Sequence, residues 1–501
     1  MLSIAGILVS LALLMWFAYR GVSVLLLAPL AALVAVLATP DVPLLASYTQ
    51  VFMKAAGGFV ALFFPLFLLG ALFGKLMEDS GAARVIALRF VDWLGARRAV
   101  LAVVLACAVL TYGGVSLFVV AFAVYPVALE LFRRADVPRR LIPATIALGA
   151  FTFTMTALPG TPAIQNAIPM PYFGTTPFAA PGLGIVAALL MLGGGMGWLN
   201  RRVRRAHAAG EGFGAQPEAQ ASTDTPDVAA AASAPQAPAL ERRIRPHAQG
   251  EGYDVAELGT AGAAAAPLPG IGAAAAPIVG VVVLNWLFST QWLPRLDSAY
   301  LALPLYGATR LETVLGTWSI IAALALANLG MLVGLRKCLA APKATLDAGA
   351  SAAVLPIFNT ASQVGYGAVI ASLAGFVLIR DAVLAVAPGN PLVSLAVAVN
   401  ILAGVTGSAS GGMSIALQTL GSTYLEMGRA AGIDAQLLHR VTTIATGGLD
   451  TLPHNGAVIT LLAICKLTHR QSYFDIFVVA VVFPLVALVA VLVLAAVFGA
   501  F

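Results

Sequence analysis

Charge is scarce in this chain. Only 10% of its 501 residues are Asp, Glu, Lys or Arg, whereas 60% are hydrophobic. Soluble globular proteins average about 25% charged residues, so this chain has too few ions to cover a surface in water. Its apolar residues instead fall in repeated runs of roughly 17 to 25, the length that spans a hydrocarbon core of about 30 Å. A soluble globular protein is therefore excluded, and the sequence predicts a polytopic, all-α membrane protein.

Cysteine is also rare, and we expect no cleavable leader. The three cysteines, Cys107, Cys338 and Cys465, are isolated in or beside apolar stretches. Because they lack the spacing of metal ligands, we expect no disulfide, no zinc site and no cofactor. The N-terminus has no basic segment before its apolar run and no small-residue cleavage site after it. Residues 2–17 are thus predicted to be a retained first span.

The net charge of +6 is explained by topology rather than by nucleic-acid binding. Basic residues flank the apolar runs, as they do on the cytoplasmic side of membrane spans. With the central hydrophilic segment in the cytoplasm, the basic residues left outside are Lys54, Arg295, Arg310, Arg380, Arg429 and Arg440. We therefore predict a bacterial-type inner membrane protein with both termini outside, in contact with the lipid bilayer and not with nucleic acid.

One hydrophilic segment divides two apolar halves. Residues 200–268 are rich in Ala, Pro, Gly and Gln and hold too few large apolar side chains to pack, which predicts a disordered cytoplasmic linker. Residues 1–199 and 269–501 are then a first and a second transmembrane repeat. Apolar stretches are expected at about 2–17, 22–38, 55–76, 99–111, 115–132, 141–158 and 179–199, and at about 270–288, 314–335, 350–379, 391–409, 411–428, 435–449, 456–467 and 473–499.

The two halves share sequence features in the same order, which indicates an internal duplication. The matching segments are Pro65-Leu66-Phe67 and Pro356-Ile357-Phe358, Gly113-Gly114 and Gly411-Gly412, and Leu158-Pro159 and Leu452-Pro453. Broken backbone at membrane depth must be buried or line a cavity. Residues 99–132 and 391–428 are therefore predicted as re-entrant helical hairpins with Gly-Gly tips, and residues 141–168 and 435–467 as broken helices. Five crossings per half make this an inverted repeat, as in many secondary transporters.

Only one carboxylate, that of Asp450, is predicted at depth, inside the second broken helix, and His454 is the only histidine placed there. An ionisable group inside the membrane is a functional hypothesis by default. Histidine, or an aspartate that has lost its water, can titrate near neutral pH. We therefore predict that Asp450 or His454 carries the coupling proton. In the alternative interpretation, Asp450 caps the following helix and His454 is a satisfied buried donor.

The hairpin tips are uncharged but rich in hydrogen-bond donors. The second arm of each hairpin begins at its tip, and the free amides and positive dipole end of a helix N-terminus attract anions. These features predict substrate binding by Gly113, Gly114, Ser116, Ser410, Gly411, Gly412 and Ser414. The alternative is tight helix packing through small residues.

Neutral polar side chains of the broken helices complete the predicted substrate site. They are Thr161, Gln165 and Asn166 in the first half and Asn455 in the second. Hydroxyl and amide groups without charge suit a hydroxylated anion better than a cation. Alternatively, these groups only satisfy backbone that the neighbouring prolines leave unpaired.

Two longer stretches resemble a known family. Residues 73–82, Phe-Gly-Lys-Leu-Met-Glu-Asp-Ser-Gly-Ala, and residues 449–459, Leu-Asp-Thr-Leu-Pro-His-Asn-Gly-Ala-Val-Ile, are similar to the gluconate:proton symporter (GntP) family. The resemblance covers nearly the whole chain apart from the linker. It implies a permease that imports an organic anion by proton symport, with Asp450 and His454 matching the family's motif.

The first hairpin tip departs from that family. Its gluconate permeases carry a Phe-Phe-Glu-Val-Gly type of sequence where this chain has Tyr-Gly-Gly-Val-Ser at residues 112–116. Because the acidic residue is missing, a short hydroxy carboxylate such as 3-hydroxybutyrate is as good a candidate as gluconate. A homodimer is compatible with these features.

Other functions have weaker support. Sodium coupling stays open, because unwound carbonyls near residues 407–410 could coordinate the ion. An intramembrane enzyme would use Ser410 or Ser414 with His439 or His454, but no G-x-S-x-G or H-E-x-x-H motif occurs. A channel is disfavoured because charged rings are lacking. We therefore predict a transporter with alternating access that is not an enzyme.

Overall fold

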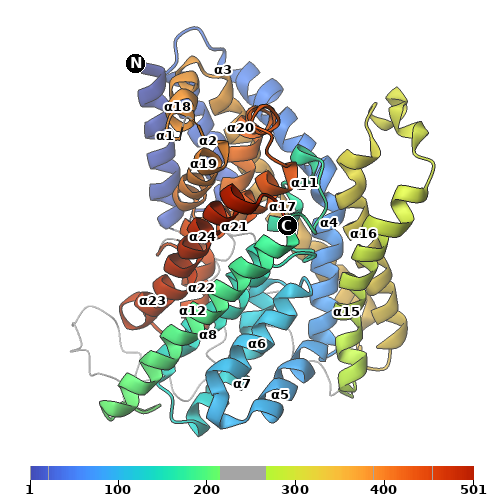
Figure 1. Ribbon diagram of the computed structural model, residues 1–501, viewed down its shortest axis with the longest axis vertical. Coiled ribbons are helices and arrows are strands. Elements are labelled where there is room, and N and C mark those ends of the chain that lie inside the picture. Colours follow the sequence, from blue (N-terminus) through green and yellow to red (C-terminus); the bar gives the residue numbers. More distant parts are fainter. Residues whose placement is uncertain (1, 21, 215–266, 388, 454) are drawn as a thin grey trace.

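The computed structural model describes residues 2–20, 22–214, 267–387, 389–453 and 455–501. All regular secondary structure in these residues is helical (Figure 1). Five of the helical segments are long and apolar enough to cross a membrane: Leu44–Asp79, Pro181–Ala208, Ile271–Arg295, Leu311–Gly334 and His469–Phe498. The predicted multi-pass, all-α class is confirmed, whereas five crossings per half stay a prediction.

The first half begins with a pair of packed helices, α1 and α2, and ends with the long helix α12. Its helices are α1 (Leu2–Tyr19), α2 (Val24–Leu37), α3 (Leu44–Ala46), α4 (Met53–Asp79), α5 (Ala82–Leu94), α6 (Ala99–Tyr112), α7 (Leu117–Arg134), α8 (Ile142–Ala150), α9 (Phe153–Thr156), α10 (Ile164–Ala167), α11 (Met170–Phe173) and α12 (Pro181–Ala208). The π-helical segment η1 (Ser47–Phe52) joins α3 to α4, and the 3₁₀ turn η3 (Arg139–Leu141) precedes α8.

The second half follows a similar order. Its helices are α15 (Ile271–Leu287), α16 (Leu311–Gly334), α17 (Pro342–Ser372), α18 (Ala374–Leu384), α19 (Pro391–Thr406), α20 (Ala409–Ala430), α21 (Ala435–Leu449), α22 (Gly456–Ile464), α23 (His469–Phe477) and α24 (Phe483–Phe498). The π-helical segment η5 (Phe288–Trp292) continues α15, and η9 (Val478–Val482) joins α23 to α24.

A short helix precedes each hairpin: α5 before the first and α18 before the second. The apolar pattern of the sequence did not predict either as a separate helix. α5 meets α6 at 102°, and α17 meets α18 at 97°. The sequence of α5 contains Arg84, Arg89 and Asp92, which interrupt its apolar pattern. The single run predicted over residues 350–379 is wrong, because Leu373 adopts an extended backbone (φ −82°, ψ 140°) that ends α17.

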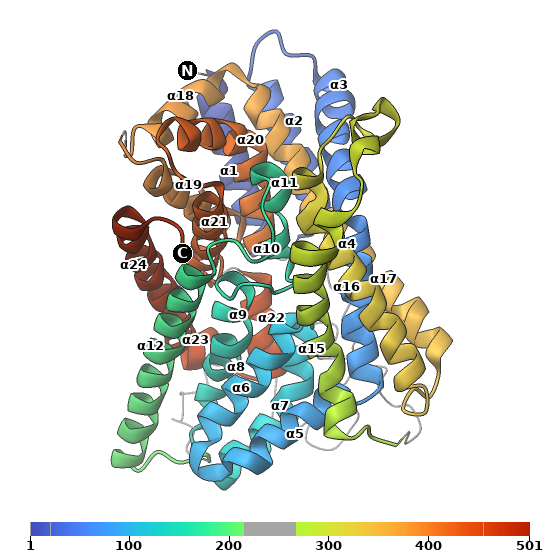
Figure 2. The ribbon, with the colours of Figure 1, turned by 45° about the vertical axis from the view of Figure 1, so that its right-hand side comes forward.

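The two predicted hairpins lie towards opposite ends of the molecule. α6 and α7 are in the lower part of Figures 1 and 2, and α19 and α20 are in the upper part. The long helices α4 and α17 pack against each other (Figure 2). Their close approach depends on Gly349, where a β-carbon would lie 3.0 Å from the side chain of Leu72.

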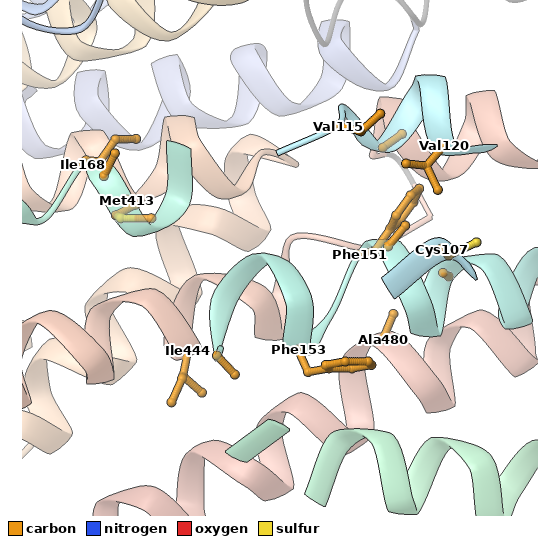
Figure 3. Close-up of a cluster of buried hydrophobic side chains, with 14 of the residues drawn as sticks. Cys107, Val115, Val120, Phe151, Phe153, Ile168, Met413, Ile444 and Ala480 are labelled. Atoms are coloured by element: carbon orange, nitrogen blue, oxygen red, sulfur yellow. The ribbon is translucent and has the colours of Figure 1, made fainter. Parts of the chain in front are cut away.

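A shared apolar core surrounds the first broken helix. α8 ends and α9 begins on either side of Phe151 and Thr152. Figure 3 shows Phe151 and Phe153 beside this break, in the same buried cluster as Val115 of the first hairpin and Ile444 of α21. Because residues of both halves contribute, the halves form one hydrophobic core.

The start of the predicted linker is ordered. α12 continues to Ala208, past the predicted boundary at residue 200. Beyond it, Glu211 pairs with Arg140 at 2.6 Å, and the backbone N–H of Phe213 donates to Asp136 at 2.9 Å. The rest of the predicted linker, residues 215–266, lies outside the described residues.

Candidate functional site

A cavity of about 200 Å³ lies where both hairpin tips, the first broken helix and the two long helices meet. Its lining comprises Leu66, Phe67, Gly70 and Ala71 of α4, Thr111, Gly114, Val115, Ser116 and Leu117 at the first tip, Met155, Pro162, Ala163, Ile164 and Gln165 of the first broken helix, Ala352, Ala353, Pro356 and Thr360 of α17, and Ser410. No charged side chain is among these lining residues.

The first tip is shaped by a glycine in the left-handed region. α6 ends at Tyr112, and Gly114 has φ +94°, a conformation that only glycine adopts without strain. The backbone N–H of Val115 donates back to Leu110 at 3.1 Å, which closes the turn. Gly114 and Ser116 line the cavity, and Leu117 begins α7 there. That they bind the substrate stays a prediction. Gly113 instead faces α15, because a β-carbon on it would lie 2.8 Å from Ile278.

The turn of the second hairpin is not at its Gly-Gly pair, so the predicted position of this tip is wrong. Gly407 ends α19 with φ +62°, and the Ser408 hydroxyl caps α20 by accepting from the Gly411 N–H at 3.2 Å. Gly411 and Gly412 lie in the first turn of α20. Neither is among the cavity lining residues, which include Ser410 from this tip.

Close packing explains these two glycines and also places Ser414. A β-carbon on Gly412 would clash with the backbone of Ala403 in the other arm, and one on Gly411 would clash with Gln363 of α17. This is the small-residue packing that was the alternative interpretation. Ser414 is fully buried on α20 and is likewise absent from the cavity lining.

The electrostatics of the cavity come from helix ends. α7 and α20 have 18 and 22 residues, and both begin at the cavity wall. The first amides of a helix have no partner within it, and its N-terminus carries about half a positive charge. Thr111 adds a buried hydroxyl whose oxygen has no hydrogen-bond partner in the described structure. The arrangement can hold an anion that also carries polar groups.

Of the three candidates in the first broken helix, only Gln165 lines the cavity. The Thr161 hydroxyl donates to the Tyr112 carbonyl at 3.4 Å. The Asn166 amide donates to the carbonyls of Thr161 and Pro177, each at 3.0 Å. Thr161 and Asn166 therefore stabilise the irregular backbone, which was the alternative interpretation for them.

The second broken helix has a comparable construction. Asn455 donates to the Gly407 carbonyl at 2.6 Å and accepts from the Val458 N–H at 2.9 Å, so it caps α22 and ties it to the hairpin tip. Asp450 follows α21 and is only 3% exposed. It is not part of the cavity lining. His454, the other predicted proton carrier, lies outside the described residues.

Asp450 is not the only buried ionisable residue among those that the structure describes. Arg440, expected outside, is fully buried in α21, as is His439 beside it. Asp475 of α23 is 1% exposed and pairs with Arg202 at 2.8 Å and Arg140 at 3.3 Å. Counting charges along the chain assigns a side of the membrane but not burial, because burial depends on partners far away in sequence.

A cavity among broken helices in a protein with several apolar spans defines a membrane transporter. The family model described as GntP family permease matches residues 1–199 of this chain. A Bacillus subtilis (strain 168) protein named uncharacterized transporter YxjC is 43% identical to this chain over 478 residues, which is 95% of each. The chain therefore belongs to the GntP permease family, as its motifs indicated.

Proposed function

We propose that this transporter imports a small organic anion by proton symport. The observation that carries the proposal is the uncharged cavity at which α7 and α20 begin. Two helix N-termini favour a carboxylate, and the polar groups of Thr111, Ser116 and Gln165 suit hydroxyl groups on the rest of the substrate. The cavity volume of about 200 Å³ lies below the roughly 300–1,000 Å³ typical of drug-sized ligands. It supports gluconate or a short hydroxy carboxylate such as 3-hydroxybutyrate.

Alternating access is part of the proposal. The hairpins lie towards opposite ends of the molecule (Figure 2), and residues of both tips line one cavity together with residues of α4 and α17. Such a placement supports an inverted repeat whose halves move relative to one another around a central site. A cytoplasmic linker, termini on the outside and an inner-membrane location belong to the same proposal.

The hydrogen bonds of the second tip favour a proton over sodium as the coupling ion. The carbonyl of Gly407 accepts from Asn455 at 2.6 Å, that of Ser408 from the Gly412 N–H at 2.9 Å, and that of Ala409 from Thr446 at 2.6 Å. Because donors of the protein already occupy these oxygens, fewer are available to replace the water around a sodium ion. Asp450 lies in the second broken helix, as do Thr446 and Asn455, and it is 3% exposed. Its carboxylate offers a site for the coupling proton.

Uptake into proteoliposomes tests this proposal. Radiolabelled gluconate and 3-hydroxybutyrate are supplied under an imposed pH gradient or an imposed sodium gradient, with unlabelled carboxylates as competitors. We expect accumulation driven by the pH gradient and competition by short hydroxy acids. Uptake driven only by sodium contradicts proton coupling, and no uptake of any organic acid contradicts the substrate class.

A further inference from the structure

Arg440 is a fully buried cation without an acidic partner among the described residues. Its Nε and Nη2 donate to the Ala179 carbonyl at 2.9 and 2.7 Å, and its Nη1 donates to the Ala157 carbonyl at 3.1 Å. Longer contacts of 3.4 Å reach the Pro177 carbonyl and the Asn166 Oδ1. Every partner belongs to the first broken helix or the loop after it, whereas Arg440 belongs to α21 of the second half.

The surroundings of Arg440 are shaped for its side chain. Gly184 of α12 faces it, and a β-carbon there would lie 3.2 Å from the Arg440 Nε and would clash with the Ala157 carbonyl. The ring of the neighbouring His439 lies 2.6 Å from the Thr175 hydroxyl and 3.2 Å from Asn166 Oδ1. Arg440 and His439 thus hold the same segment of the first broken helix from one turn of α21.

Binding these backbone carbonyls does not require a positive charge. A guanidinium cannot lose its proton in a protein, and removing a charge from water costs several kcal/mol even after relaxation. A neutral donor would satisfy the same carbonyls without that cost. Asp450 does not neutralise Arg440, because ten residues of helix at 1.5 Å per residue separate them by about 15 Å along α21.

The hydrogen-bond partners of Arg440 include residues next to the cavity lining in sequence. Its partner Asn166 follows Gln165, which lines the cavity, and Ala157 lies two residues after the lining residue Met155. The cavity itself has no charged lining residue. An unpaired positive charge bound to residues next to an uncharged lining adds to the potential of the two helix N-termini, and low-dielectric surroundings screen it poorly.

We propose that Arg440 is the positioning residue that gives the transport cavity its affinity for anions: it holds the first broken helix in place and supplies the positive potential that attracts the carboxylate. This inference rests on the proposed function, since it requires that the substrate be an anion. Arg440 is not among the lining residues, so its charge acts at a distance and does not touch the substrate.

Uptake kinetics of two Arg440 variants separate charge from packing. Arg440→Gln removes the charge and keeps donors for the carbonyls, whereas Arg440→Lys keeps the charge and loses the planar fork. We expect Arg440→Gln to raise the KM for the carboxylate about tenfold, equivalent to about 1.4 kcal/mol, with the maximal rate per folded transporter nearly unchanged. Arg440→Lys should keep the KM within about twofold. Equal KM changes in both variants, or an unchanged KM in Arg440→Gln, overturn the inference.

A second variant keeps the test decisive if Arg440→Gln does not fold. Asn166→Asp places a carboxylate next to the guanidinium and neutralises its field, so it should also raise the KM; an unchanged KM overturns the inference. His439→Gln is the comparison for packing alone, because it weakens the second hold on the same segment and leaves the charge of Arg440 in place. Its KM should rise less than that of Arg440→Gln. If the wild type takes up no carboxylate, both this inference and the proposed function fail. If it does and the KM values contradict the expectation, only this inference fails.

Discussion

The side-chain amide of Asn455 donates a 2.6 Å hydrogen bond to the carbonyl of Gly407 and thereby ties the second broken helix to the tip of the second hairpin. The first half has a corresponding tie, in which the Thr161 hydroxyl donates to the Tyr112 carbonyl at 3.4 Å. In both halves the acceptor lies at the end of the hairpin's first arm. In each half the break is therefore hydrogen-bonded to the tip of the hairpin, a connection on which the proposed alternating access relies.

Replacing Asn455 by Asp tests this connection. The carboxylate still accepts from the Val458 N–H but cannot donate to Gly407, so a buried carbonyl loses its partner. We expect the free energy of unfolding to fall by about 1–3 kcal/mol, with a lower rate of uptake, measured by thermal denaturation in detergent and in proteoliposomes. Asn390→Asp is the control, because Asn390 caps α19 only as an acceptor, from Leu392 and Val393. If Asn455→Asp is as stable as this control, the tie is unimportant.

The packing of the second hairpin depends on Gly412. Gly412→Ala places a β-carbon against the backbone of Ala403, and overpacking of this kind typically costs about 1–3 kcal/mol. We therefore expect a lower melting temperature in detergent. Gly280→Ala in α15, where nothing lies within 4 Å, should be neutral or slightly stabilising, since alanine favours helix by up to about 1 kcal/mol. Equal melting temperatures for both variants would mean that the arms separate easily.

Thr111 is expected to contact the substrate. It is 5% exposed, lines the cavity, and its hydroxyl oxygen has no hydrogen-bond partner in the described structure. Thr111→Val should therefore leave stability nearly unchanged and raise the KM for hydroxy acids by a few-fold to about tenfold, the value of one hydrogen bond. Thr145→Val is the comparison, because the Thr145 hydroxyl donates to Leu141 at 2.8 Å inside the protein. It should reduce stability and leave the KM unchanged.

Asp450→Asn should abolish accumulation driven by a pH gradient and should spare expression. An amide of nearly the same shape cannot carry the coupling proton, and exchange of substrate between equal concentrations can still proceed. Counterflow and pH-driven uptake, measured side by side, separate the two activities. Asp434→Asn is the matched control on α21, because Asp434 caps that helix as an acceptor for the Gln436 N–H at 2.8 Å and asparagine caps equally well. Normal pH-driven uptake by Asp450→Asn would exclude Asp450 as the proton carrier.

The ion pair at the start of the linker predicts a pH dependence of stability. The hydrogen bonds from Arg140 lower the pKa of Glu211 from its ordinary value of 4.5. A lowered pKa in the folded state means that the stabilisation is present above the ordinary pKa and is lost as the pH falls through the folded value. Because the pair is partly exposed, Glu211→Gln should cost below about 1 kcal/mol at pH 7. The difference in melting temperature between wild type and variant should disappear at acidic pH, and a difference that persists there would contradict the pairing.

Part of the cavity lining could be predicted because its signals are local. Gly114 stands out as one of a Gly-Gly pair that interrupts an apolar run, and a helix that resumes after such a break presents its N-terminus there. Ser410 followed from the same reasoning, and Gln165 from its place among the neutral polar side chains of the first broken helix. Local sequence did not distinguish these cavity-lining residues from Thr161, Asn166 and Gly412, which are of similar residue types. Thr161 and Asn166 hydrogen-bond to backbone carbonyls instead, and Gly412 packs against the other arm of its hairpin.

The sequence by itself determined that this is a helical membrane protein of the GntP permease family, with breaks and hairpins near the predicted positions, because hydropathy and helix breaking are properties of neighbouring residues. Only the tertiary structure decided which polar groups face the cavity and that Arg440 lies buried against the first broken helix and the loop after it. Arg440 binds carbonyls more than 250 residues away in the chain (Ala179 and Ala157). Burial of a charge depends on the partners that folding brings to it, and no pattern of adjacent residues contains that information.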